Sequence, residues 1–97
     1  MKQSVNFYDF EKAFAEIRPN HFTRAGLVAL FDYLEALEEE TGEEIELDVI
    51  GLCCDFVEYK NIAEFNSDYG TNYKSRDEIR ETIVIDVDDD AFIIQAF

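Results

Sequence analysis

The sequence predicts an α+β fold in which a three-stranded, largely antiparallel sheet is covered by helices, in the order ααβααββ. Three observations lead to this class. Two amphipathic helical patterns open the chain, short β-rich runs close it, and capping or turn residues separate the elements. A length of 97 residues suits one hydrophobic core, so we expect one acidic domain over 1–97. Hydrophobic residues make up 47% of the chain, which favours a folded protein over a disordered one.

The first two elements are helices. Between positions 7 and 17, apolar residues recur at spacings of three and four, with Asn6 as N-cap and Pro19 enforcing the exit. Thr23 can cap a longer helix that ends near Gly42. The core-facing residues we expect on these helices are Phe7, Phe10, Phe14, Ile17, Leu27, Leu30, Phe31, Leu34 and Leu37.

The segment 45–54 is expected to form the first strand. Ile45, Leu47 and Val49 alternate with acidic residues, which is typical of a strand with one solvated face. The run from Val49 to Cys54 is continuously apolar, so the strand should become buried toward its end.

The rest of the chain predicts two short helices and a hairpin. Asn61 with Glu64, and Ser75 with Glu78, resemble capping boxes, so helices are expected near 61–69 and 76–81. The β-rich runs 83–87 and 91–97 flank an acidic turn at 88–90. We expect the helices to gather on one side of the sheet.

Charge is distributed in blocks. The 23 acidic and 8 basic residues give a formal net charge of −15. Residues 25–59 hold eleven acidic groups and no basic one, and residues 81–97 hold five acidic groups and no basic one. Such a chain repels phosphate backbones and anionic lipid, so direct binding to nucleic acid or membranes is not expected. The start of the chain has no apolar run of signal-peptide length, which predicts a soluble intracellular protein.

Residues suited to catalysis or metal binding are sparse. His21 is the one histidine and falls in a predicted turn, no glycine-rich phosphate loop is present, and we expect neither an enzyme nor a cofactor. Cys53 and Cys54 are adjacent, which suits reduced thiols and lacks the gap that zinc chelation needs. The run from Asp86 to Asp90 imitates the start of a calcium loop, but the glycine is missing and position twelve is Phe97.

The dense acidic run is the strongest candidate for function. Asp32, Glu35 and Glu39 fall on one stripe of the second predicted helix, and further acids follow in the turn and along the first predicted strand. Carboxylates every three or four residues form an array comparable to, though sparser than, the phosphates of a duplex. We therefore expect a mimic of DNA that pairs with lysine and arginine of a partner. The candidate partner-binding residues are Asp32, Glu35, Glu38, Glu39, Glu40, Glu43, Glu44, Glu46 and Asp48, with Asp88, Asp89 and Asp90 as a second patch.

Three strings of the chain carry a resemblance. The segments Phe31-Asp-Tyr-Leu-Glu, Glu43-Glu-Ile-Glu-Leu-Asp-Val-Ile and Leu52-Cys-Cys-Asp-Phe-Val-Glu-Tyr resemble a family of small acidic proteins of phages and mobile elements, and the ending Phe92-Ile-Ile-Gln-Ala-Phe is similar too. In charge and length the chain is similar to anti-CRISPR and anti-restriction proteins that imitate DNA. The resemblance implies a counter-defence protein in the host cytoplasm, with a CRISPR effector complex as the preferred partner and a restriction enzyme as the alternative.

Two other classes remain open from the sequence. An acidic antitoxin or regulatory adaptor would bind a basic protein partner through an apolar hot spot, with Phe56 and Tyr59 as candidate anchors. Tyr33, Tyr69 and Tyr73 also lie near acidic residues and could serve as interface anchors. A small enzyme or cation-binding protein is the third class, and it predicts a large shift of the melting temperature with calcium or zinc.

Overall fold

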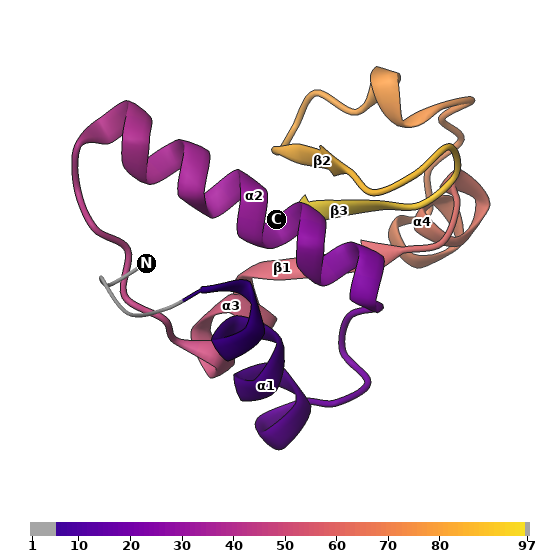
Figure 1. Cartoon of the computed structure of the whole chain (residues 1–97). Helices are drawn as coiled ribbons and strands as arrows, with labels where there is room; N and C mark the ends of the chain where they lie inside the picture. The colour runs from indigo at the N-terminus through magenta and orange to yellow at the C-terminus, as the bar shows by residue number, and fades with distance from the viewer. Residues whose placement is uncertain (1–5, 97) are drawn as a thin grey trace.

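The computed structural model describes residues 6–96 and confirms an α+β fold with an antiparallel three-stranded sheet (Figure 1). The predicted order ααβααββ is found, with one additional helix before the first strand and a short 3₁₀ turn, η1, as the last predicted helix. The elements are α1 (Phe7–Ile17), α2 (Arg24–Thr41), α3 (Val49–Asp55), β1 (Phe56–Tyr59), α4 (Ile62–Tyr69), η1 (Arg76–Glu78), β2 (Val84–Asp86) and β3 (Phe92–Gln95).

The first two helices begin where their capping residues predict. Asn6 accepts a hydrogen bond from the backbone N–H of Asp9, whose side chain accepts from the backbone N–H of Asn6, so α1 opens with a complete capping box. Thr23 Oγ1 accepts from the N–H of Gly26 at the start of α2. Local sequence therefore sets the N-terminal ends of both helices.

The prediction of a strand over 45–54 is wrong. Residues 43–48 have no regular structure, α3 occupies Val49–Asp55, and the strand comes later, as β1. Asp48 caps α3 by accepting from the N–H of Gly51 at 3.0 Å, and Val49 and Leu52, three residues apart, are its buried positions. Ile45 and Leu47, the apolar residues of the alternating run, instead pack against the core cluster from an irregular segment.

Strand β3 lies at the centre of the sheet, which has the order β1-β3-β2. It pairs antiparallel with β1, with Val57 opposite Ile94, and with β2, with Ile85 opposite Ile93. The predicted hairpin with its turn at 88–90 is found, but β2 and β3 are shorter than the predicted runs 83–87 and 91–97, of which Phe97 lies outside the described residues. Because β3 is buried on both faces, its run of Phe92, Ile93 and Ile94 is apolar throughout.

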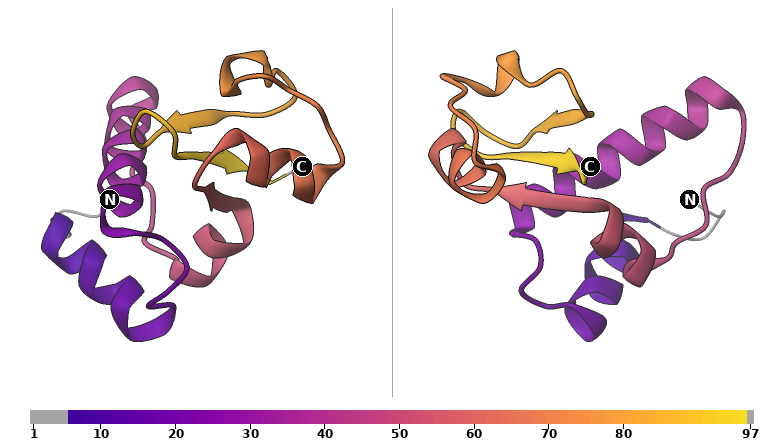
Figure 2. Two further views of the ribbon diagram at one scale, coloured as in Figure 1. Left: turned by 90° about the vertical axis from the view of Figure 1, so that its right-hand side faces the viewer. Right: turned by 180° about the vertical axis from the view of Figure 1, so that it is seen from behind.

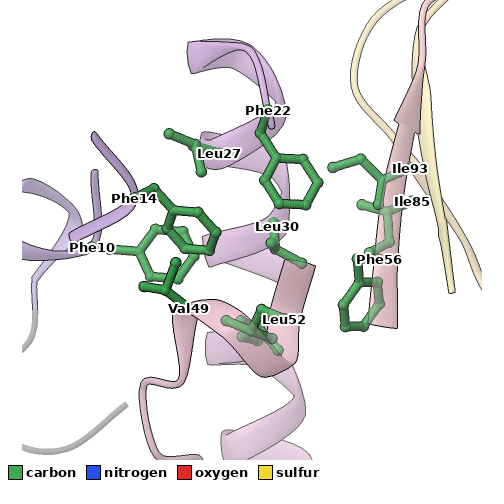
Figure 3. Packing of buried hydrophobic residues seen from close by; sticks show 11 residues of the cluster. Phe10, Phe14, Phe22, Leu27, Leu30, Val49, Leu52, Phe56, Ile85 and Ile93 are labelled. Atoms are coloured by element: carbon green, nitrogen blue, oxygen red, sulfur yellow. The ribbon is translucent and has the colours of Figure 1, made fainter. Parts of the chain in front are cut away.

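Side chains cover both faces of the sheet, which corrects the expectation of helices on one side. On one face, Phe56, Ile85 and Ile93 join a cluster with residues of α1, α2 and α3 (Figure 3). On the other face, Ile94 packs in a second cluster with Phe65 of α4. The views in Figure 2 show α2 and α4 on opposite sides of the strands. The sheet is therefore the middle layer of the fold.

The last predicted helix is shorter than expected. Residues 76–81 contain only η1, and Ser75 makes no side-chain capping hydrogen bond. Helix α4 fits its prediction, because Asn61 accepts from the N–H of Glu64 at 2.8 Å. The stretch 60–80 thus forms the cover of the second face.

Candidate acidic interaction surface

The C-terminal half of α2 presents carboxylates outward. The helix buries Leu27, Leu30 and Leu34 in the core, with Phe31 and Tyr33 partly buried beside them, so its acidic positions lie on the opposite side. Asp32, Glu39 and Glu40 are exposed, whereas Glu35 and Glu38 are half-buried. The predicted stripe of Asp32, Glu35 and Glu39 therefore lies on one helical face, as their spacing of three and four requires.

The chain turns back at the end of α2 and brings more carboxylates to the same place. Gly42 has a positive φ of 74°, which glycine adopts without steric cost, and its N–H donates to the carbonyl of Glu38 at 2.8 Å. Thr41 Oγ1 donates to the carbonyl of Leu37 and accepts from the N–H of Glu43. The turn is thus closed by backbone and hydroxyl contacts, and the carboxylates of Glu43 and Glu44 remain exposed.

Residues 43–48 connect the end of α2 to α3 without forming a strand. Their backbone is held by Glu38, whose Oε2 accepts from the N–H of Ile45. Ile45 and Leu47 are partly buried against the cluster on the α2 face of the sheet. Glu46, between them, is exposed. The apolar side chains of this segment therefore pack against the core, and its acidic side chains are exposed to solvent.

The result is a shallow hollow of about 400 Å³ at the C-terminal end of α2, which we call the acidic hollow. No lysine or arginine is among its lining residues within the described part of the chain. Five carboxylates and one glycine line it: Glu35, Glu38, Glu39, Glu43, Glu44 and Gly42. Like charges gathered this closely repel one another, so a cationic group placed among them would relieve the repulsion.

Two further predicted site residues have structural roles. Asp48 is the N-cap of α3, and not a residue on the solvated face of a strand. Asp88 Oδ1 accepts from the N–H of Ala91 at 2.6 Å and of Asp90 at 2.9 Å, which closes the turn between β2 and β3. These backbone hydrogen bonds, that to Ala91 first, lower the pKa of the Asp88 carboxyl below its usual value.

The second predicted patch does not join the first. Figure 1 shows the 88–90 turn at the opposite end of the sheet from the C-terminal end of α2. Asp89 and Asp90 are exposed and line a cleft of about 290 Å³ that also contains Lys74 and Arg76. Arg76 pairs with Asp86 at 3.1 Å and donates to the carbonyl of Ala91 at 2.6 Å. Cations therefore accompany the acids at this end.

Glu58 is a structural carboxylate that no local sequence pattern indicates. It lies on β1, and its two oxygens accept from the N–H and Oγ1 of Thr23 at 2.8 and 2.7 Å, so it covers the N-terminus of α2. A Cβ on Gly26 would meet the Glu58 carboxylate at 2.4 Å, which explains why a glycine suits this position. Because Thr23 and Glu58 are 35 residues apart, no short sequence motif indicates their contact.

The residues singled out for other chemistry are mostly structural. His21 Nε2 lies 3.1 Å from the carbonyl of Phe56, and its ring contacts Phe22. Cys53 and Cys54 are free, and burial raises the pKa of the Cys53 thiol. Among residues 6–96, no group of His, Cys, Asp and Glu is arranged to hold a metal ion.

The apolar hot spot expected for an adaptor is not available. Phe56 is 7% exposed and Tyr59 is 5% exposed, and both belong to the core. Tyr33, Tyr69 and Tyr73 are half-buried against the two clusters, so core packing accounts for the tyrosines as well. The described residues therefore offer acidic surface, and not these aromatic anchors, for a partner.

None of the helices within residues 6–96 combines the length and apolar character needed to cross a bilayer. No protein-family model, curated protein or solved structure matches the chain.

Proposed function

We propose that the protein is an inhibitor that occupies a cationic DNA-binding groove of another protein in place of DNA. The acidic hollow is the observation that supports this most directly, because it concentrates five carboxylates on a segment that the fold holds in place. A rigid array of negative charges can pair with several lysine and arginine side chains at once, as phosphates do.

The charge spacing supports the proposal. Asp32 to Glu40 span about 12 Å of helix axis at about 1.5 Å per residue. Five carboxylates lie on that length, Asp32, Glu35, Glu38, Glu39 and Glu40, which is about one per 2.5 Å. Duplex DNA carries one charge per about 1.7 Å of axis. The helix is therefore somewhat less densely charged than a duplex, and Glu43 and Glu44 add to the array beyond its end.

The target we propose is a CRISPR effector complex that recognises its flanking motif in duplex DNA, with the inhibitor acting in a phage-infected host cell. A mimic of duplex DNA would compete there at the first recognition step. The same surface would also suit the DNA-binding groove of a restriction enzyme. The inhibitor would use the same carboxylates against either target.

The test is a charge reversal with a matched control. Glu39, Glu43 and Glu44 are changed together to Lys, and the control changes Glu16, Asp55 and Asp77, which are exposed elsewhere, to Lys. Both variants change the net charge equally. Binding of labelled target DNA by a purified CRISPR effector, and separately by a restriction enzyme, is measured with each inhibitor added.

We expect the wild type and the control to block DNA binding and the hollow variant to lose inhibition by at least about a hundredfold, since each charge-assisted contact is worth about 1.5–3 kcal/mol. Inhibition should also weaken by orders of magnitude between low and high salt. If the hollow variant inhibits as well as the control does, the acidic hollow is not the binding surface. If the wild type blocks neither enzyme class, the mimic proposal itself fails for those targets.

A further inference from the structure

We propose that residues 76–82 form a strap that closes a strand-addition site on β2, and that Arg76 holds this strap in place. When the strap opens, the edge of β2 takes an extended cationic segment of a partner protein as a further strand of the sheet. The proposal goes beyond the inhibitor function, because it concerns the edge of the sheet and does not use the acidic hollow.

The outer edge of β2 has backbone groups without partners. The N–H of Val87 donates to the carbonyl of Ala91 at 3.1 Å, so these two residues form a hydrogen-bonded pair of the β2–β3 ladder. Such pairs alternate along an antiparallel ladder, so the N–H and C=O groups of Val84 and Asp86 point away from β3. Within residues 6–96, no group forms a hydrogen bond with them. These are the groups that an added strand would use.

The strap lies beside this edge but does not pair with it. In Figure 1 the chain between α4 and β2, which includes η1, passes along β2 on the side away from β3, and the views in Figure 2 agree. No backbone hydrogen bond joins residues 76–82 to β2 in the described part of the chain. The strap therefore occupies the place of a further strand and leaves the outer backbone groups of β2 unsatisfied.

Arg76 connects the strap to the β2–β3 hairpin. Its Nε lies 3.1 Å from Oδ1 of Asp86 in β2, and its Nη1 donates to the carbonyl of Ala91 at 2.6 Å. Ile79 holds the strap separately, because its side chain is buried in the second cluster. Loss of the Arg76 side chain should therefore free the strap from the edge of β2 while Ile79 still fixes it to the core.

The charge and the pleat of β2 indicate which segment fits the open edge. Residues 81–90 contain five carboxylates and no lysine or arginine, and the side chain of Asp86 is 76% exposed even beside Arg76. Side chains alternate between the two faces of a strand, so Asp86 and the exposed Ile83 lie on opposite faces. A segment that alternates lysine with apolar residues matches both. A second copy of the chain would bring the same carboxylates together, which repulsion opposes.

The test uses two synthetic peptides of about eight residues, an ordinary strand length, in which valine and lysine alternate. One peptide is N-methylated at its lysines and the other at its valines. In an antiparallel pairing that places lysine opposite Asp86, the lysine N–H groups face β2, so methylation of the lysines blocks the pairing and methylation of the valines does not. The two peptides carry the same charge, so binding through charge alone does not distinguish them.

Binding is measured by titration calorimetry at about 150 mM salt for wild type, Arg76→Ala and the control Lys74→Ala, which removes the same charge from a neighbouring position. We expect Arg76→Ala to bind the valine-methylated peptide at least about tenfold more tightly than wild type does, and at least about tenfold more tightly than the lysine-methylated peptide. Lys74→Ala should stay within about twofold of wild type. In the complex, NMR should show slower amide exchange at Val84 and Asp86.

Three results would overturn the proposal. Equal binding of the two peptides by Arg76→Ala would show attraction by charge without strand pairing, and no gain over wild type would show that Arg76 does not hold the strap. Protection of the Val84 and Asp86 amides that rises with protein concentration alone would make a second copy the added strand. Arg76→Gln, which keeps a donor for the carbonyl of Ala91, serves if Arg76→Ala does not fold, with a smaller gain expected for the valine-methylated peptide. Failure to inhibit any nuclease would reject the inhibitor function and leave this test unaffected.

Discussion

Both ends of the sheet carry several carboxylates, and they differ in what those carboxylates contact. At the C-terminal end of α2, Glu39, Glu43 and Glu44 are exposed around the acidic hollow, which has no lysine or arginine among its described lining residues. At the β2–β3 turn, Asp88 accepts two backbone N–H groups, and Asp86 pairs with Arg76.

The comparison shows that an acidic residue in the sequence is not the same as a displayed charge. At the hairpin end the carboxylates stabilise the turn and are partly neutralised, so they should contribute to stability. At the α2 end the carboxylates repel one another, so they should reduce stability, and a role in binding would explain their presence. Substitutions of Asp88 and of the exposed acids Glu39, Glu43 and Glu44 should therefore change stability in opposite directions.

The largest expected change in stability follows from substitution of Arg76. Its side chain is 20% exposed and connects the segment before β2 to both Asp86 and the carbonyl of Ala91. We expect Arg76→Ala to lower the free energy of unfolding by about 1.5–3 kcal/mol, chiefly through the lost hydrogen bond to Ala91, because Asp86 is largely exposed. Urea denaturation would measure this, with Lys74→Ala as a neighbouring control that should stay within about 0.5 kcal/mol.

A smaller decrease in the free energy of unfolding is expected for Asp88→Ala, with Asp89→Ala as the control. The backbone hydrogen bonds that lower the pKa of Asp88 make the ionised carboxylate favour the folded state. That contribution is full above the ordinary carboxyl pKa of about 4 and is lost as pH falls through it toward the lowered value.

The stability gap between wild type and Asp88→Ala should accordingly narrow as pH falls below about 4. Thermal melts at a series of pH values would show it. A gap of constant size down to pH 2 would mean that the ionised form of Asp88 does not hold the turn.

The smallest expected change in stability is for Glu39→Gln, which should stabilise the protein where the two preceding substitutions destabilise it. Glu39 lies four residues from both Glu35 and Glu43 and near the C-terminus of α2, where a negative charge is unfavourable. We expect a gain of about 0.2–0.5 kcal/mol in the free energy of unfolding at low salt, disappearing in about 0.5 M NaCl as the repulsion is screened. A loss of stability instead would show that the Glu39 carboxylate, like that of Glu38, has a structural role.

Local sequence was sufficient for several elements. The capping box of Asn6 and Asp9, the cap at Thr23 and the glycine at position 42 define α1 and α2, because capping contacts join residues only a few positions apart. The hairpin of β2 and β3 was also predictable from its β-rich runs and acidic turn. The stripe of carboxylates on α2 followed from helical spacing alone.

Tertiary structure decided the rest, because it depends on contacts between residues far apart in the chain. The apolar run at 49–54 is compatible with strand or helix, and it forms α3, whose Val49 and Leu52 are buried in the cluster shared with α1, α2 and the sheet. The contact of Glu58 with Thr23 and the separation of the two acidic ends arise only once the sheet has formed. The sequence by itself thus determined how many carboxylates the protein has and on which helix they recur, while the folded chain determined which of them face solvent together.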